Sequence, residues 1–436
     1  MTTTLKTYPE YKDSGAEWMK KIPEEWSVVK PKIIFRERKE KSLSRDIHLT
    51  PSQKYGVLPQ HKYMEITGGR VVLNLIGSDN MKHLERGDFV IHLRSFQGGI
   101  EYSSYTGKVS IAYTVLVPDP QVDQGFLKYA LKSHGYISEL ASKTDQLRDG
   151  QSIKFYTFNL VNLPKPPIAF QKNIANYLDE KTKVIDELIS KKEIMIKLLR
   201  EKRSSLITQA VTKGLDPKAK MKDSNLNWVG KMPENCMVYK LRNVLKSGIV
   251  DGPHETPEYL EEGIPFISVD SVDENEKVNL DIVKKFISEE QYREYNKKTK
   301  LTENDILFTK AASIGKVAIV DKRKFMTWSP LAILKPNPDK IYYKYLFYVL
   351  KSDSFVGYVK NNCNLNTQLN IGMKILERSM IVLPETIDDQ IRIGDYLDRR
   401  VNIFHRAIKL VEENIHQLKE YRSSLIYSAV TGKIKV

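Results

Sequence analysis

Residues 203–214 read RSSLITQAVTKG and residues 422–433 read RSSLIYSAVTGK, so the chain contains nearly the same helix ending twice. Three further pairs of segments repeat in the same order: 12–30 with 222–240, 84–93 with 301–310, and 171–181 with 390–400. Their offsets grow slowly, from 210 through 217 to 219 residues. Repeats that keep their order over the whole chain indicate a tandem duplication, with small insertions in the second copy.

Each copy ends in a long segment that lacks proline and has the period of a coiled coil. In the second copy the spacing alternates between four and three, with Arg422 as the only polar break: Leu397, Val401, Phe404, Ile408, Val411, Ile415, Leu418 and Leu425. Subtracting 219 gives the same frame in the first copy: Leu178, Thr182, Ile185, Ile189, Lys192, Ile196, Leu199, Arg203 and Leu206. Matching frames favour pairing of the two helices with each other, along a seam of ~42 Å, over two unrelated bundle helices.

The first ~150 residues of each copy have a different character. Short β-branched and aromatic runs, such as GRVVLNLI, GDFVIHL and SIAYTVLV, alternate with glycine and proline. Such runs predict short strands mixed with some helices. The predicted fold class is therefore α+β: two mixed α/β domains and two long helices, related by an internal pseudo-two-fold repeat.

The composition limits the cellular setting and the partners. The chain has 436 residues and a formal net charge of +15, which favours a polyanionic partner, either nucleic acid or an anionic membrane surface. The two cysteines, Cys236 and Cys363, form no CxxC pair, which argues for a reducing compartment. The N-terminus has no apolar secretion signal and no apolar run reaches membrane-spanning length, so we expect a soluble cytoplasmic protein without a membrane partner.

Catalytic motifs are missing from the sequence. Gly315-Lys316 is followed by Val317 and lacks the upstream glycine of a phosphate-binding loop, and no G-x-G-x-x-G follows a strand. His254 stands alone in the turn DGPHETP, where a structural role is favoured over metal or acid–base chemistry. We therefore expect neither catalytic nor metal-binding nor cofactor-binding residues in this chain.

Polar clusters in both copies are candidates for contacts with DNA, because arginine, lysine, glutamine, asparagine and tyrosine reach base edges or phosphates. In the first copy the candidates are Arg94, Ser95, Gln97, Tyr102, Tyr105, Lys108, Arg148 and Gln151. In the second copy they are Lys310, Ser313, Lys316, Asn364, Asn366 and Gln368. For each residue, a hydrophilic loop that caps turns is the alternative.

The duplication, the repeated Trp-x-x-x-(Ile/Met)-Pro-Glu motif, the stretches DGPHETPEYLEEGIPFI and NDILFTKAASIGKVAIV, and the paired helix ends together resemble the specificity subunit of type I restriction–modification enzymes. The resemblance implies two target recognition domains, 1–165 and 215–385, and two conserved helical regions, 166–214 and 386–436. It also implies that the helices form an antiparallel coiled coil and that each recognition domain reads one half of a split, asymmetric site in double-stranded DNA.

The same resemblance implies the partners. Two methyltransferase subunits are expected to dock on the helical regions, and restriction (translocase) subunits to join that complex. S-adenosylmethionine, ATP and magnesium then belong to those partners, and the chain itself binds no cofactor. Two other classes stay open on the residues alone, a stand-alone site-specific nuclease and a coiled-coil scaffold that binds no DNA.

Overall fold

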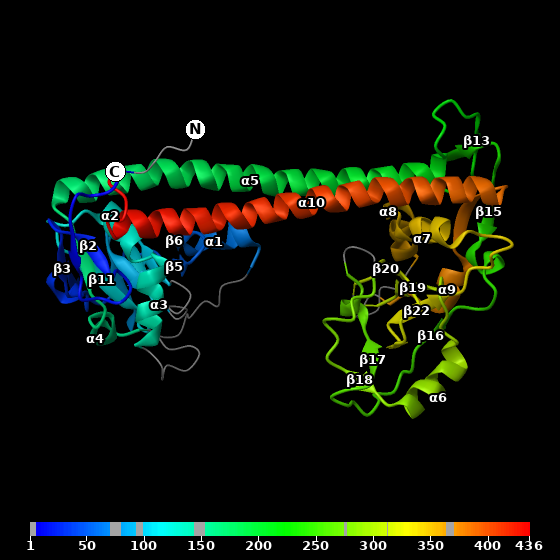
Figure 1. The fold of residues 1–436 in the computed structure, drawn as a ribbon, viewed down its shortest axis with the longest axis horizontal. Coiled ribbons are helices and arrows are strands. Elements are labelled where there is room, and N and C mark those ends of the chain that lie inside the picture. The colour runs from blue at the N-terminus through cyan, green and yellow to red at the C-terminus, as the bar shows by residue number, and fades with distance from the viewer. Residues whose placement is uncertain are drawn as a thin grey trace. The chain divides into compact units, whose positions relative to one another are not determined.

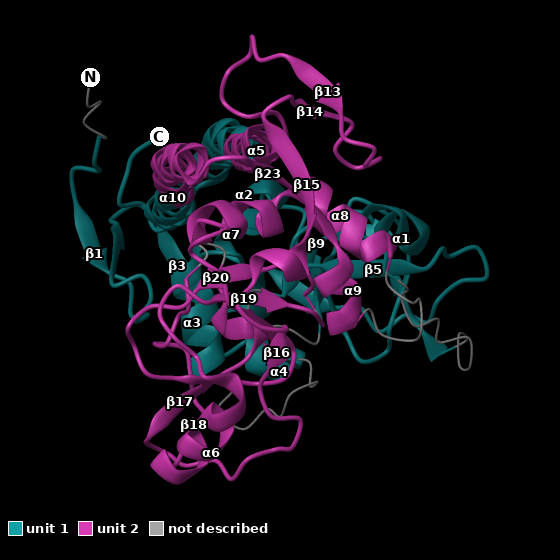
Figure 2. Cartoon of the chain, turned by 90° about the vertical axis from the view of Figure 1, so that its right-hand side faces the viewer, with its two compact units in different colours: residues 1–191, 413–436 teal, residues 192–412 magenta. Residues whose placement is uncertain are grey.

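The computed structural model describes residues 6–69, 80–92, 99–143, 153–273, 277–311, 313–362 and 370–436. The chain forms two compact units (Figure 2): unit 1 comprises residues 1–191 and 413–436, and unit 2 comprises residues 192–412. Both boundaries fall inside long helices, α5 (Ile168–Lys213) and α10 (Ile387–Val430). Each unit therefore contains a segment of both helices.

The two long helices pack together in antiparallel orientation (Figure 1). In unit 1 the Arg422 guanidinium donates from Nε and Nη2 to the two Asp186 carboxylate oxygens, at 2.9 and 3.1 Å. In unit 2 Arg200 Nη2 lies 3.3 Å from Glu412 Oε1. Every predicted seam position from 178 to 206 and from 397 to 425 is buried or partly buried, so the predicted coiled-coil seam is confirmed. In the described part of the chain, no helix is both long and apolar enough to span a membrane.

Unit 1 is built on a four-stranded antiparallel sheet of order β4-β11-β8-β9. Its strands are β1 (Tyr11–Asp13), β2 (Lys21–Pro23), β3 (Ser27–Val29), β4 (Phe35–Glu37), β5 (Leu49–Ser52), β6 (Gly56–Pro59), β7 (Lys82–Leu84), β8 (Phe89–Ile91), β9 (Ile100–Tyr102), β10 (Gly107–Val109), β11 (Thr114–Pro118) and β12 (Leu163–Lys165). Its shorter helices are α1 (Gln60–Thr67), α2 (Gln124–Ala130), α3 (His134–Ser142) and α4 (Phe155–Phe158), with the 3₁₀ turn η1 (Pro31–Ile33).

Unit 2 repeats this plan, with a four-stranded antiparallel sheet of order β16-β22-β19-β20. Its strands are β13 (Met221–Asp223), β14 (Lys231–Pro233), β15 (Cys236–Lys240), β16 (Val250–Asp251), β17 (Ile264–Ile267), β18 (Phe286–Ile287), β19 (Ile306–Thr309), β20 (Val317–Ile319), β21 (Met326–Thr327), β22 (Leu331–Leu334) and β23 (Met380–Pro384). Its helices are α6 (Glu289–Thr299), α7 (Tyr343–Lys351), α8 (Asp353–Asn361) and α9 (Met373–Arg378), with the 3₁₀ turns η4 (Leu241–Val244) and η5 (Val269–Ser271).

Two of the three predicted strands lie at the centre of the unit 1 sheet. The run GDFVIHL contains β8, whose three residues are all buried, and SIAYTVLV contains most of β11. Because β8 and β11 are covered on both faces, their sequences are continuously apolar rather than alternating. The third predicted strand, GRVVLNLI, lies almost wholly outside the described residues.

Equivalent hydrogen bonds show that the two units share one frame. The Gln171 side-chain carbonyl accepts from the Asp123 amide at 2.9 Å, and 219 residues later Gln390 accepts from the Tyr342 amide at 2.9 Å. The same offset relates two tyrosine–aspartate bonds of 2.6 and 2.7 Å, Tyr129–Asp179 and Tyr348–Asp398. In both units these contacts tie the short helix after the central sheet to the start of the long helix.

The two repeated helix endings close the two units differently. In unit 1 the C-terminal segment returns to the N-terminal motif: Lys435 N–H donates to Lys6 O at 2.7 Å, and the Tyr427 hydroxyl donates to Trp18 O at 2.9 Å. In unit 2 the first helix ending leads directly into the second motif, and the Tyr345 hydroxyl donates to Val211 O at 3.1 Å. In unit 2 the helix ending and the motif that it contacts follow each other along the chain. In unit 1 they come from opposite parts of the chain and meet only in the folded protein.

Candidate nucleic-acid interface

A cavity of about 810 Å³ in unit 1 brings two predicted residues together, Tyr102 on β9 and Tyr105 in the turn that follows. The Tyr102 ring packs edge-on to Phe89, with ring centroids 5.4 Å apart, and the Lys62 ammonium lies 5.6 Å from the centre of the Tyr105 ring. The cavity is also lined by five basic residues, Lys54, Lys128, Lys132, Lys183 and Arg422, and by three acidic ones, Glu101, Asp179 and Asp186. The acidic residues pair with Lys132, Lys128 and Arg422. A cavity with more basic than acidic side chains and with partly exposed tyrosine rings suits a phosphate-bearing, base-bearing ligand.

The third described candidate of the first copy, Lys108, lies on β10 and does not line this cavity. Its backbone N–H donates to Ile47 O at 2.8 Å. Burial, and next the Lys108 ammonium, lower the pKa of nearby His48. Lys108 is therefore separate from the Tyr102–Tyr105 pair.

A buried ion pair forms part of the cavity wall. The Glu101 carboxylate is 1% exposed and lies 2.5 Å from Lys132 Nζ and 4.0 Å from His92 Nε2. Burial raises the pKa of Glu101 to about 7, although Lys132 acts to lower it. Lys132 is thus paired within the protein, with a carboxyl group whose pKa of about 7 leaves it only partly ionised at neutral pH.

In unit 2 the candidate Lys310 is engaged inside the protein. Its ammonium lies 3.3 Å from the Asp251 carboxylate, which is 1% exposed and also pairs with Lys298 at 2.9 Å and His254 at 3.1 Å. Burial acts to raise the pKa of Asp251, but Lys298 and Lys310 outweigh it and the pKa falls below its ordinary value. Contact between Lys310 and DNA remains a prediction, and it requires a donor that already has a partner.

Ser313 and Lys316 line a second cavity, of about 400 Å³, together with Lys351 and Lys360. The Thr309 hydroxyl shapes the turn between them, since it donates to Ser313 O at 2.5 Å and accepts from Lys316 N–H at 2.9 Å. Gly315 has a φ of +97°, and a β-carbon there would lie 2.7 Å from Val356 on α8. Only glycine allows this loop to approach α8 so closely.

The other eight candidates lie outside the described residues: Arg94, Ser95, Gln97, Arg148, Gln151, Asn364, Asn366 and Gln368. The structure instead adds residues that the sequence analysis missed, Lys132 in unit 1 and Lys351 and Lys360 in unit 2. A signal for two of them was present, because the tripeptide Leu-Lys-Ser occurs at 131–133 and again at 350–352.

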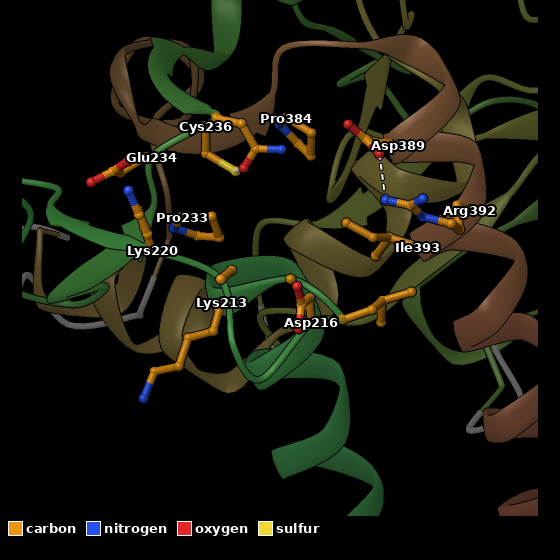
Figure 3. A pocket seen from close by; sticks show the side chains of 14 residues that line it. Lys213, Asp216, Lys220, Pro233, Glu234, Cys236, Pro384, Asp389, Arg392 and Ile393 are labelled. Carbon is orange, nitrogen blue, oxygen red and sulfur yellow. Dashed lines mark hydrogen bonds and ion pairs between the residues drawn. The ribbon is translucent and has the colours of Figure 1, made fainter.

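A third cavity, of about 550 Å³, lies in unit 2 between the end of α5, β15 and the start of α10 (Figure 3). Its buried Cys236 occupies the position of Trp26 in the first copy, where Trp26 is 1% exposed and packs against Tyr8 with ring centroids 5.7 Å apart. Burial raises the pKa of the Cys236 thiol to about 11, so at neutral pH the nucleophilic thiolate is scarce.

Among the described residues, no cluster of three or more histidine, cysteine or carboxylate side chains could hold a metal ion.

Comparison with known proteins defines the class. The profile of the type I restriction modification DNA specificity domain matches residues 233–419. The specificity subunit of the type I restriction enzyme EcoBI from Escherichia coli is 24% identical, over 73% of this chain and 67% of its own length. That of MjaVIII from Methanocaldococcus jannaschii is 23% identical, over 95% of this chain and 94% of its own.

Solved structures share the fold. A chain from a study of complex assembly and conformational transition of the type I R-M system has a TM-score of 0.68 at 16% identity, over 94% of this chain and 98% of that one. The HsdS subunit from Thermoanaerobacter tengcongensis has a TM-score of 0.50 at 15% identity, over 95% and 98%. The architecture is that of two α/β domains joined by a packed helix pair.

The chain is similar over its whole length to type I restriction–modification specificity subunits, and residues 233–419 match the specificity domain of that family. Proteins of this family recognise DNA targets in restriction–modification systems and are not themselves catalytic. The predicted resemblance is confirmed, and the comparisons support a specificity subunit of the non-catalytic kind.

Proposed function

We propose that each α/β domain of this chain reads one half of an asymmetric, bipartite site in double-stranded DNA. The observation that carries the proposal is that the two units share the same hydrogen bonds at equivalent positions but have different polar surfaces. The tyrosine–aspartate and glutamine–amide bonds repeat in both units, whereas unit 1 has the Tyr102–Tyr105 cavity and unit 2 has the lysine cavity beside Ser313. Two readers on one repeated scaffold would recognise two different half-sites.

The paired helices set the unread spacer in this proposal. Half-sites read through the major groove lie about one helical turn, ~34 Å, or a multiple of it apart. The helix α5 has 46 residues and is therefore ~69 Å long, so it extends beyond both ends of the seam. The continuous apolar seam supports a stiff spacer rather than a flexible linker.

The helices also offer docking faces to methyltransferase subunits. Apolar side chains away from the seam are half exposed in both units. In unit 1 they are Val184, Leu188 and Tyr421, and in unit 2 they are Ile194, Met195, Leu198, Ile403 and Leu410. Such side chains on otherwise charged helices are typical of a surface that a partner covers. Val184 and Ile403 are equivalent at the offset of 219, and a helix pair with an internal two-fold repeat suits two identical methyltransferase subunits, to which restriction subunits then bind.

The S-adenosylmethionine, ATP and magnesium chemistry resides in those partner subunits in this proposal, and the assembly acts in the cytoplasm. The chain itself only binds DNA and positions the partner subunits on it. Adenine methylation and restriction are the activities that it would direct.

The first test uses the purified chain alone with duplex DNA and magnesium. We expect binding that weakens steeply with salt and no cleavage. Cleavage by the chain alone would favour a stand-alone nuclease, and an affinity that did not fall with salt would favour a scaffold without a role in DNA binding.

The second test changes the length of the helix pair. Insertion of four residues into both helices lengthens each by ~6 Å. Mapping of methylated adenines in cells that carry the chain with its partners should then show a changed spacer. An unchanged spacer in an active complex would refute the role of the helices as a spacer.

A further inference from the structure

A fourth cavity, of about 180 Å³, lies in unit 1 between the beginning of α3 and the last turns of α10, and is called the α3 cavity below. Four of its seven lining residues are basic and none of the seven is acidic. The lining residues are Lys132, Ser133, His134, Lys419, Arg422, Ser423 and Ile426.

The charges around the α3 cavity do not cancel. Lys132 Nζ lies 2.5 Å from Glu101, and Arg422 donates to both carboxylate oxygens of Asp186. Lys419 is exposed, and in the described part of the chain it forms no ion pair. Even with both carboxylates fully ionised, the cavity therefore keeps at least the positive charge of Lys419.

The beginning of α3 offers donors without acceptors. The first N–H groups of a helix have no partner within the helix. Ser133, the residue before α3, makes no side-chain cap, and the first turn contains no acidic residue. The Ser133 hydroxyl is 1% exposed, and among the described residues it has no hydrogen-bond partner. An anion in the cavity would accept from such donors, and it would be stabilised by the helix dipole.

At the equivalent place of unit 2, the chain supplies an anion of its own. At the offset of 219, His134 corresponds to Asp353, in the first turn of α8. The Asp353 carboxylate accepts from the Ser204 hydroxyl, and the counterpart of Ser204 is Ser423 in the α3 cavity. The basic positions are kept at the same offset, since Lys132, Lys419 and Arg422 correspond to Lys351, Arg200 and Arg203.

The serine before the helix shows the same contrast. In unit 2 the Ser352 hydroxyl accepts from Phe355 N–H at 3.3 Å and donates to Val349 O at 2.8 Å. Its counterpart in unit 1, Ser133, makes neither bond. Unit 1 therefore keeps the serines and the basic residues of this place, but it lacks the carboxylate that unit 2 holds there.

The α3 cavity is continuous with the candidate nucleic-acid interface, because Lys132 and Arg422 line both this cavity and the Tyr102–Tyr105 cavity. Asp186, whose counterpart in unit 2 is His405, lines only the Tyr102–Tyr105 cavity. The carboxylate that unit 1 has gained thus stays outside the α3 cavity. This continuity favours DNA over a partner protein as the source of the anion.

We propose that the α3 cavity binds one phosphate of the DNA backbone, at the place that the Asp353 carboxylate takes in unit 2. The inference rests on the proposed function. The Ser133 and Ser423 hydroxyls and the beginning of α3 donate to the phosphate oxygens, and Lys419 supplies the charge. Such a contact fixes the position of unit 1 on the duplex and carries no sequence information.

The test compares two variants of the full chain, each with a matched control. His134→Asp introduces the carboxylate of unit 2 into the cavity. Its control is Ser138→Asp, which adds the same charge at an exposed position of α3 outside the cavity. Lys419→Met removes the charge, and its control is Lys172→Met, since Lys172 is also exposed on a long helix and does not line the cavity.

Fluorescence anisotropy measures the affinity for duplex DNA between about 50 and 200 mM salt. Loss of one phosphate contact lowers the salt slope by about 0.9, so each cavity variant should lose about 3.5-fold less affinity over this range than its control. At low salt each should bind more weakly than its control. His134→Asp should also melt at a higher temperature than Ser138→Asp, because the new carboxylate lies at the beginning of α3.

The phosphate site would be overturned if His134→Asp bound DNA with the affinity and salt slope of Ser138→Asp, or if Lys419→Met matched Lys172→Met. The proposed function would then still stand, because wild type binds DNA. A wild type that bound no DNA would refute both.

A further variant, Ser133→Ala, separates binding from folding. Because the Ser133 hydroxyl has no partner in the described chain, its loss should leave the melting temperature unchanged and weaken DNA binding at low salt. A lower melting temperature with unchanged DNA affinity would show a structural role of the hydroxyl and count against the phosphate site.

Discussion

Removal of the buried arginine of unit 1 provides a quantitative test of its core electrostatics. Arg38 is 4% exposed, and its Nε lies 2.8 Å from Oδ2 of Asp88, which is 3% exposed. Glu40 and Glu85 also pair with Arg38, but both are half exposed and contribute little. The variant Arg38→Leu leaves the Asp88 carboxylate buried without its cation, which costs about 3–5 kcal/mol. For a unit of about 200 residues this lowers the melting temperature by about 6–20 °C.

Scanning calorimetry measures the effect, and a second variant isolates its cause. In Arg38→Leu/Asp88→Asn the asparagine oxygen can still accept the Glu85 amide, which lies 2.9 Å from Asp88 in the native chain, but no charge is buried. This double variant should therefore recover to within about 1 kcal/mol of wild type. Arg36→Leu, at an exposed position on β4 two residues before Arg38, is the control. A double variant no more stable than Arg38→Leu would refute the reasoning.

Three further predictions concern single positions. Gly432→Ala should destabilise clearly more than Gly230→Ala in urea denaturation: both have φ near +70°, but only at Gly432 would the new β-carbon meet a proline ring at 2.4 Å. The raised pKa of Glu101 means that the folded state holds this proton more tightly than the unfolded state. Wild type should therefore lose up to about 3 kcal/mol relative to Glu101→Gln as the pH rises from about 4.5 through 7 in denaturation curves. Tyr348→Phe removes the 2.7 Å hydrogen bond to Asp398 and should cost about 1.5–3 kcal/mol in thermal unfolding, and an unchanged stability would contradict that role.

The seam was predictable because burial along a helix leaves a periodic trace in the sequence. Leu178, Ile185, Leu397 and Val401 are all 5% exposed or less, as the alternating spacing required. The duplication was predictable for a similar reason, since the contacts that hold each unit, such as the glutamine–amide bond, need the same residues at the same offset. Core packing and repeated hydrogen bonds constrain residue type, and such constraints can be read from one sequence.

The surface chemistry was less predictable, because it depends on residues that are distant in sequence. Lys310 looked like a free cation in its local context, yet Asp251 lies 59 positions earlier and pairs with it in the folded chain. Lys351 is the last residue of the apolar helix α7, and only the folded chain places it beside the 313–316 loop. Local composition alone cannot separate a lysine that faces a cavity from one that holds an internal ion pair.

The return of the C-terminal segment to the N-terminal motif has a consequence for biosynthesis. Domains generally fold as units, N-terminal first, as the ribosome releases the chain at about 5–20 residues per second. Here the unit that is made first contains residues 413–436, so it waits roughly 10–50 seconds for its last pieces, whereas unit 2 is complete once residue 412 has emerged. A stop codon directly after residue 412 would therefore damage unit 1, which is begun first, and leave all residues of unit 2 in place.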